Sequence, residues 1–240
     1  MTPETLAALF DHTLLKPEAD ARAIAALCAD AAACGFRTVC VNPVWVPFAV
    51  RELAGTKVGV CSVAGFPLGA TRAKPVEAAR AVDEGAAEID MVGATGLLKS
   101  GDASGYRDDI SDVVAAVAGR PLKVIIETCL LTDEEKVLAC RLCEEAGASF
   151  VKTSTGFSGG GATAADVALI ARTVGGRLGV KASGGISTLD RALEMLSAGA
   201  TRLGSSSSAG IISEMRMRAA GGVSQPPAMP PARCRRRSRS

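Results

Sequence analysis

Three charged residues lie within short apolar segments of the chain. Lys152 and Lys181 each follow a valine, and Asp90 stands between an isoleucine and a methionine. Burial disfavours the charged ammonium, and two protonated lysines placed on strands that are neighbours but one would repel, so the pKa of one of them would be lowered. An uncharged amine can attack a carbonyl carbon to form an imine. Asp90 would then supply a carboxylate for proton transfer.

The same pattern has a structural interpretation. A Lys-Asp-Lys ion cluster inside a fold perturbs pKa values without performing chemistry. The position of the three residues at strand ends favours catalysis, because barrel enzymes carry their reacting groups there. The pattern does not choose between Lys152 and Lys181 as the nucleophile.

Two glycine- and serine-rich segments suggest an anion site. Residues 183–185 read Ser-Gly-Gly, and residues 204–207 read Gly-Ser-Ser-Ser. Glycines let backbone N–H groups approach an oxyanion, and hydroxyl groups with a helix N-terminus complete such a site. Barrels often bind phosphate after their last two strands. A phosphorylated carbonyl compound is therefore the predicted substrate.

A recurring unit must position these residues. A β-branched run, a polar loop, an amphipathic helix and a glycine follow one another along the chain. The runs are residues 10–14, 36–41, 57–63, 88–92, 122–127, 149–152, 178–181 and 201–203. They fit either a closed eight-stranded barrel or an open doubly wound sheet. No G-x-G-x-x-G follows the first run, so an α/β (β/α)8 TIM barrel is favoured, with an extra N-terminal helix over residues 2–9.

Helix ends are marked by local signals. Thr132 with Glu135 predicts a capping box, and Thr163 and Ser187, each followed three residues later by aspartate, predict weaker versions of it. Glycines before the strands predict helix C-termini at positions 35, 85, 147 and 199.

The composition excludes several classes of protein. The 240 residues are 48% hydrophobic and 22% charged with a formal net charge of +2, which argues against a disordered chain. No apolar run approaches the ~18 residues of a membrane span, and residues 1–11 do not form a signal peptide. Eight cysteines are predicted to be reduced thiols of a cytoplasmic protein. Cys140 and Cys143 form an isolated C-x-x-C, so no zinc site is expected.

The C-terminal segment differs from the rest of the chain. Five arginines and no acid follow Ala219, so with a total of +2 the remainder of the chain carries −3. Residues 1–218 are predicted to form the barrel, and residues 219–240 a disordered Pro/Arg-rich tail. A solvated extension is favoured. The alternative is a catalytically impaired barrel whose tail binds nucleic acid or another acidic partner.

The sequence resembles the deoxyribose-phosphate aldolase family over about residues 5–215. The similarity rests on two lysine motifs, FVKTSTGF at 150–157 and VKASGGI at 180–186, and on residues 11–17, 38–43, 63–69 and 88–92. The resemblance implies a class I aldolase that needs no metal or cofactor. Such an enzyme reversibly cleaves 2-deoxy-D-ribose 5-phosphate into glyceraldehyde 3-phosphate and acetaldehyde. Another phosphosugar lyase or isomerase is the enzymatic alternative, and relatives commonly associate as homo-oligomers.

The resemblance also implies a role for individual residues. Lys152 would form the Schiff base, Lys181 would lower its pKa and help to move protons, and Asp90 with a bound water would exchange protons. The phosphate would be held by Gly156, Gly184, Gly185, Gly204, Ser206 and Ser207. Asp11 and Thr13 would be polar lining, and Cys40 a thiol near the pocket. Ser208 occupies a usual glycine position and is expected to stiffen the phosphate turn.

Overall fold

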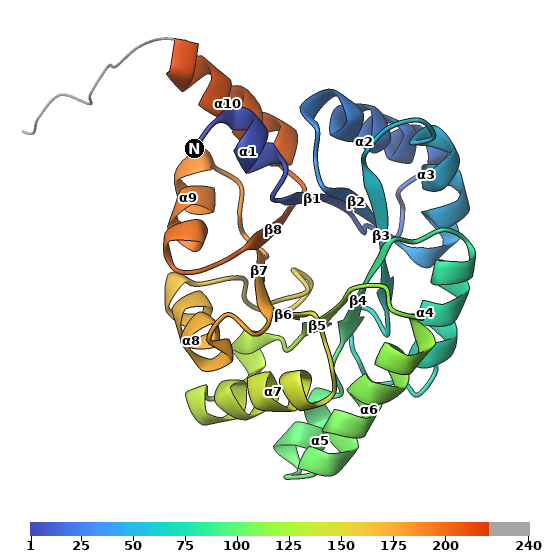
Figure 1. The fold of residues 1–240 in the computed structure, drawn as a ribbon, viewed down its shortest axis with the longest axis vertical. Helices are drawn as coiled ribbons and strands as arrows, with labels where there is room; N and C mark the ends of the chain where they lie inside the picture. Colours follow the sequence, from blue (N-terminus) through green and yellow to red (C-terminus); the bar gives the residue numbers. More distant parts are fainter. Residues whose placement is uncertain (221–240) are drawn as a thin grey trace, which may run out of the picture.

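Eight parallel strands close into a barrel at the centre of the molecule (Figure 1). The computed structural model describes residues 1–220. Each strand pairs with the next along the chain, and the last pairs with the first. The strands are β1 (Phe10–Leu14), β2 (Thr38–Val41), β3 (Gly59–Ala64), β4 (Glu88–Val92), β5 (Leu122–Ile125), β6 (Phe150–Lys152), β7 (Gly179–Ser183) and β8 (Arg202–Ser205). The predicted TIM barrel is confirmed.

Helices surround the barrel and cover the outer face of its sheet (Figure 1). They are α1 (Pro3–Ala7), α2 (Ala21–Cys34), α3 (Val46–Glu52), α4 (Lys74–Asp83), α5 (Thr95–Lys99), α6 (Ala103–Ala116), α7 (Asp133–Glu145), α8 (Ala164–Val174), α9 (Leu189–Ser197) and α10 (Ser208–Ala220). Short 3₁₀ turns occupy Pro43–Trp45 and Thr128–Leu130. The extra N-terminal helix is α1, which lies beside α10.

Side-chain caps begin several helices where the sequence predicts them. Thr132 and Glu135 form the reciprocal capping box of α7, and Thr163 accepts a hydrogen bond from the backbone N–H of Asp166 at the start of α8. The prediction for Ser187 is wrong, because Thr188 caps α9 instead. The hydroxyl group of Thr188 is as good an acceptor as that of Ser187, so the spacing of residues does not show which of them caps the helix.

The side chains of each strand alternate between two environments. Outward-facing residues such as Ile89 and Met91 belong to the apolar core between sheet and helices, whereas Asp90 between them faces the barrel interior. Valine, leucine and isoleucine therefore stabilise the contact between the sheet and the helices. The barrel interior carries polar and charged side chains, and this interior holds the site.

The predicted C-terminal tail lies largely outside the described residues. Helix α10 continues to Ala220, two residues past the predicted end of the barrel domain. The five arginines of the tail and Cys234 fall beyond it. Among residues 1–220, no helix combines the length and the apolar character that a membrane crossing requires. The seven cysteines of this range form no disulfide.

Candidate active site

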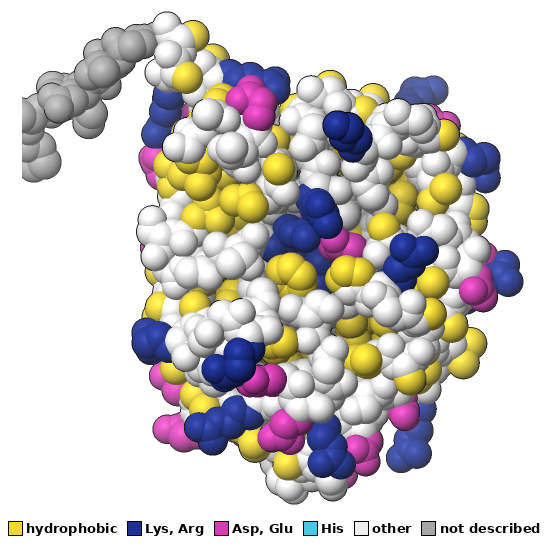
Figure 2. Space-filling view, viewed as in Figure 1, with side chains coloured by type: hydrophobic (Ala, Val, Ile, Leu, Met, Phe, Trp, Pro, Cys, Tyr) yellow, Lys and Arg dark blue, Asp and Glu magenta, His cyan; other side chains and the backbone are white. Residues whose placement is uncertain are grey.

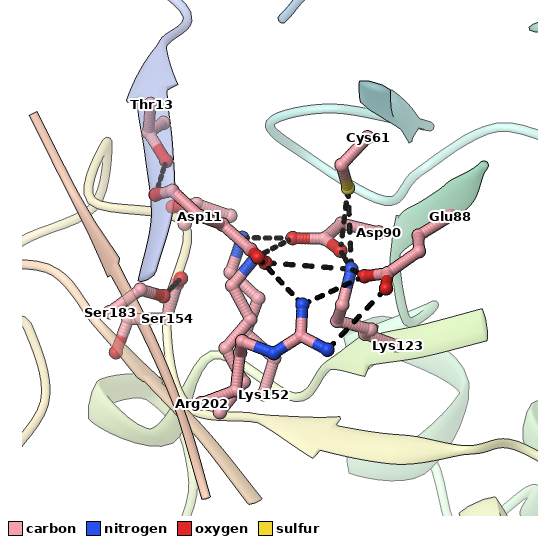
Figure 3. A network of polar contacts seen from close by, with 12 residues as sticks. Asp11, Thr13, Cys61, Glu88, Asp90, Lys123, Lys152, Ser154, Ser183 and Arg202 are labelled. Atoms are coloured by element: carbon pink, nitrogen blue, oxygen red, sulfur yellow. Dashed lines mark hydrogen bonds and ion pairs between the residues drawn. The ribbon is translucent and has the colours of Figure 1, made fainter. Parts of the chain in front are cut away.

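A cluster of seven charged side chains fills the interior of the barrel (Figure 3). Strands β1, β4, β5, β6, β7 and β8 each contribute to it. The members are Asp11, Glu88, Asp90, Lys123, Lys152, Lys181 and Arg202. We call this set the charged cluster. All seven are buried, so each charge depends on its partners rather than on water.

Asp90 lies at the centre of the charged cluster. Its Oδ2 accepts hydrogen bonds from Nζ of Lys152 and of Lys181, each at 2.7 Å, and its Oδ1 accepts one from Nζ of Lys123, also at 2.7 Å. Burial by itself would raise the pKa of Asp90. The three ammonium groups outweigh that effect and hold its pKa well below the ordinary 3.8. Asp90 is therefore an ionised carboxylate at neutral pH.

Lys152 and Lys181 lie side by side on adjacent strands. They are partners in the register of β6 and β7, so the prediction that one strand separates them is wrong. Parallel strands with crossover helices follow one another around a closed barrel, which makes consecutive strands neighbours. Lys181 also donates to Asp11. Burial would lower the pKa of Lys181, but Asp11 and Asp90 raise it above its ordinary value, so this lysine stays protonated.

Asp11 belongs to the charged cluster and does not line the pocket, contrary to the prediction. Its Oδ1 accepts a hydrogen bond from Arg202 at 2.7 Å, and its Oδ2 accepts one from Lys181. Burial would raise the pKa of Asp11, and Lys181, Lys123 and Arg202 lower it below the ordinary value instead. Alternation along β1 places Asp11 inside the barrel and Thr13 farther up the same face, at the cavity.

Sequence reasoning missed Lys123, Glu88 and Arg202. Lys123 donates to Asp90 and pairs with Glu88 at 2.7 Å, while Arg202 donates to Glu88 at 3.0 Å. Burial opposes the charge of Lys123, but Asp90 and the other acids raise its pKa well above the ordinary 10.5. The sequence did contain a signal for Lys123. This lysine stands between two apolar residues, and Lys152 and Lys181 likewise follow apolar residues. On the face seen in Figure 2, cationic and acidic side chains gather over the barrel centre.

A cavity of about 380 Å³ lies at the end of the strands, above the charged cluster. Lys152 lines it, and its side chain is 3% exposed. Lys123, Lys181 and Asp90 do not line it, and their side chains are 0% exposed. Lys152 is thus the one lysine on the described strands that a molecule in this cavity can reach.

The predicted phosphate residues surround the same cavity. Those that line it are Gly156, Gly184, Gly185, Gly204, Ser206, Ser207 and, from the other predicted group, Thr13. Cys40 does not line it. Its thiol is buried against Leu15, Cys61 and Val63 on the barrel wall. Helix α10 begins directly after the serines, which brings a helix N-terminus to this side of the cavity.

Ser208 causes no backbone strain in the turn. Among residues 1–220 only Ala118 and Glu127 combine a side chain with a left-handed backbone. Ser208 is the first residue of α10, and its hydroxyl donates to the carbonyl of Ser205 at 2.9 Å. The expected stiffening through a disfavoured conformation is therefore wrong, because this position has helical rather than left-handed geometry.

One group of side chains has the composition of a metal site. The ligand atoms of Cys40, Cys61 and Asp90 lie within 4.8 Å of one another. Asp90 already accepts hydrogen bonds from three ammonium groups, and Lys123 also donates to Sγ of Cys61 at 3.3 Å. A cation would have to displace these lysines and remain beside their charge. The residues present therefore fit ion pairing and do not fit a metal.

Comparison with known proteins agrees with this geometry. The family model of the DeoC/LacD family aldolases matches residues 5–214. Deoxyribose-phosphate aldolase of Rhodospirillum rubrum is 59% identical, over 87% of this chain and 89% of the relative, and that of Clostridium kluyveri is 53% identical, over 89% and 100%. The tetrameric deoxyribose phosphate aldolase structure from Aeropyrum pernix superposes with a TM-score of 0.84 at 33% identity, covering 90% of this chain and 92% of that one. The family model matches most of the chain, and the chain folds into a barrel with buried lysines. The chain therefore belongs to the DeoC/LacD aldolase family.

Proposed function

We propose that this protein is a class I aldolase that reversibly cleaves 2-deoxy-D-ribose 5-phosphate into glyceraldehyde 3-phosphate and acetaldehyde, with Lys152 as the Schiff-base nucleophile. The observation that carries the assignment of the nucleophile is that Lys152 alone among the lysines on the described strands lines the cavity. The reaction itself is supported by relatives that carry this activity in their names and cover nearly the same length.

The charge balance of the cluster supports the same choice. Four cationic side chains face three carboxylates. When Lys152 is uncharged, the remaining three cations and three carboxylates balance in the buried interior. An uncharged amine is also the form that attacks a carbonyl. Lys181 and Lys123 each contact at least two carboxylates, which holds them in the charged form.

The chemistry follows from these positions. Nζ of Lys152 attacks C1 of the open-chain sugar, and loss of water gives an iminium ion. Proton removal from the 3-hydroxyl breaks the C2–C3 bond, glyceraldehyde 3-phosphate leaves, and an enamine remains on Lys152. Protonation of C2 and hydrolysis release acetaldehyde. Asp90, within 2.7 Å of both Lys152 and Lys181, is placed to exchange protons with a water at the nitrogen, and protonated Lys181 supplies the positive charge beside it.

Acetaldehyde release from a set of sugar phosphates tests this proposal. We expect turnover with 2-deoxy-D-ribose 5-phosphate and far less with ribose 5-phosphate or fructose 1,6-bisphosphate. A phosphosugar isomerase or another lyase would produce no acetaldehyde from deoxyribose 5-phosphate. A barrel that only binds would turn over none of the three sugars. Either result would reject the proposed activity.

Lys16 is proposed as the cation that selects the phosphate. It is exposed, and among residues 1–220 it is, apart from Lys152, the only charged residue that lines the cavity, whose described wall contains no carboxylate. For Lys16→Gln we expect the KM for deoxyribose 5-phosphate to rise by about tenfold, equivalent to about 1.4 kcal/mol. The kcat/KM for unphosphorylated deoxyribose should stay unchanged, and Lys16→Arg should retain the wild-type KM. An equal loss with both sugars would contradict this role.

We propose that the protein is a cytoplasmic homo-oligomer. The tetrameric structure of the Aeropyrum pernix aldolase supports a homo-oligomer. Reduced thiols among the described cysteines support a cytoplasmic location. Nucleic-acid binding would depend on the arginines after Ala220, and deletion of that segment should leave aldolase turnover intact.

A further inference from the structure

Glu127 is a buried acid that the charged cluster does not include. It follows β5, its residue is 2% exposed, and its backbone has φ 54° and ψ 69°. Left-handed backbone is unfavourable for a residue with a side chain and persists where surrounding contacts impose it. Within residues 1–220 no lysine or arginine pairs with its carboxylate. Its carboxyl group therefore depends on hydrogen bonds rather than on ion pairing.

All of these hydrogen bonds come from one loop. The backbone N–H of Thr155 donates to both carboxylate oxygens at 3.2 and 3.3 Å, and the Thr155 hydroxyl donates to Oε2. The Ser158 hydroxyl donates to Oε2 at 3.0 Å. The Thr155 hydroxyl oxygen in turn accepts from the N–H of Phe157 at 3.0 Å. One carboxylate thus holds both ends of the segment 155–158.

This loop forms part of the cavity wall and follows the nucleophilic strand. It begins three residues after Lys152, and Thr155, Gly156 and Phe157 line the cavity. The ring of Phe157 packs edge-on against Phe66, with the ring centroids 5.1 Å apart, from the loop that follows β3. A displacement of segment 155–158 would move this wall while leaving Lys152 on β6.

We propose that Glu127 is a positioning residue that fixes segment 155–158 for binding of the phosphosugar. It acts through Thr155 and Ser158 and does not touch the reacting atoms. The inference rests on the proposed aldolase activity and adds to it a determinant of substrate affinity. An amide is a poor replacement, because the Thr155 N–H and two hydroxyl groups donate to the carboxylate, and an amide offers one acceptor oxygen where the carboxylate offers two.

Glu127→Gln tests the proposal. We expect the KM for deoxyribose 5-phosphate to rise by about tenfold, because the variant loses one charge-assisted hydrogen bond. The kcat should change by less than about threefold. Borohydride trapping of acetaldehyde on Lys152 should continue at the wild-type rate, since that small aldehyde does not need the loop. An unchanged KM would overturn the proposal, and so would a loss of trapping that parallels the loss of turnover.

A pair of Thr155 variants provides the matched control. Thr155→Val removes the hydroxyl that joins Glu127 to Phe157 and should raise the KM as Glu127→Gln does, whereas Thr155→Ser retains the hydroxyl and should restore the wild-type KM. This pair carries the test if Glu127→Gln fails to fold. Equal KM values for the two variants would overturn the proposal. A wild-type enzyme without turnover would instead reject the proposed function.

Discussion

Lys152→Met is expected to lower kcat/KM for deoxyribose 5-phosphate by at least about 10⁴-fold, because methionine has the length of the lysine stem without the amine that forms the imine. The variant should remain folded, since removal of one of four cations leaves the charged cluster balanced against its three carboxylates. The measurement is steady-state turnover together with thermal unfolding. A variant that retained a tenth of the wild-type activity would contradict the assignment of the nucleophile.

Lys181→Met is the matched control for this prediction. Lys181 shares Oδ2 of Asp90 with Lys152 but does not line the cavity. Turnover should fall because proton transfer loses a neighbouring cation, yet peptide mass mapping after treatment with acetaldehyde and borohydride should still find the adduct on Lys152. An adduct found only on Lys181 in the wild-type protein would reverse the two roles.

Asp90→Asn is expected to reduce both stability and activity. Three lysines direct their ammonium groups at this carboxylate, and removal of one partner from a buried ion pair costs about 3–5 kcal/mol. The kcat should fall by about 10²- to 10⁴-fold through the loss of a general acid–base group. Urea unfolding at pH 7 measures the first effect and steady-state kinetics the second.

The effect on stability has a predicted pH dependence. The folded pKa of Asp90 lies below its ordinary 3.8, so its contribution is fully present above that value and is lost as the pH falls toward the folded pKa. Below pH 3.8 the unfolding free energy of the wild type should decrease by up to about 1.4 kcal/mol per pH unit more than that of Asp90→Asn. Parallel curves for the two proteins from pH 7 to pH 2.5 would contradict the depressed pKa.

Asp109→Asn is the control that separates a loss of stability from a loss of catalysis. Asp109 accepts a hydrogen bond from the buried Lys74 at 2.6 Å, in a pair that lies outside the charged cluster. This variant should also lower the free energy of unfolding, but it should leave kcat within about twofold of the wild type. If both aspartate variants lost activity in proportion to stability, Asp90 would have only a structural role.

Local patterns were sufficient to predict the barrel and part of its site. Val151, Val180 and the residues around Asp90 pack outward in the apolar core, and a side-chain period of two then directs the charged residues between them to the interior. The same alternation marks Lys123, which stands at the second position of its strand and not at the strand end where the other reacting groups were predicted. The sequence therefore carries the signal for Lys123.

Alternation along each strand is enough to say which residues face the barrel interior, because side chains two positions apart lie on the same face of a strand. Which of these charges meet depends on how the barrel closes. Asp11 and Lys181 are 170 residues apart in the chain, and they form an ion pair because closure pairs β1 with β8. The tertiary structure also decided access to the cavity, because Lys152 lines it and its register partner Lys181 does not. The link from Glu127 to segment 155–158 has the same origin, since it depends on distances between two strand ends that no local pattern specifies.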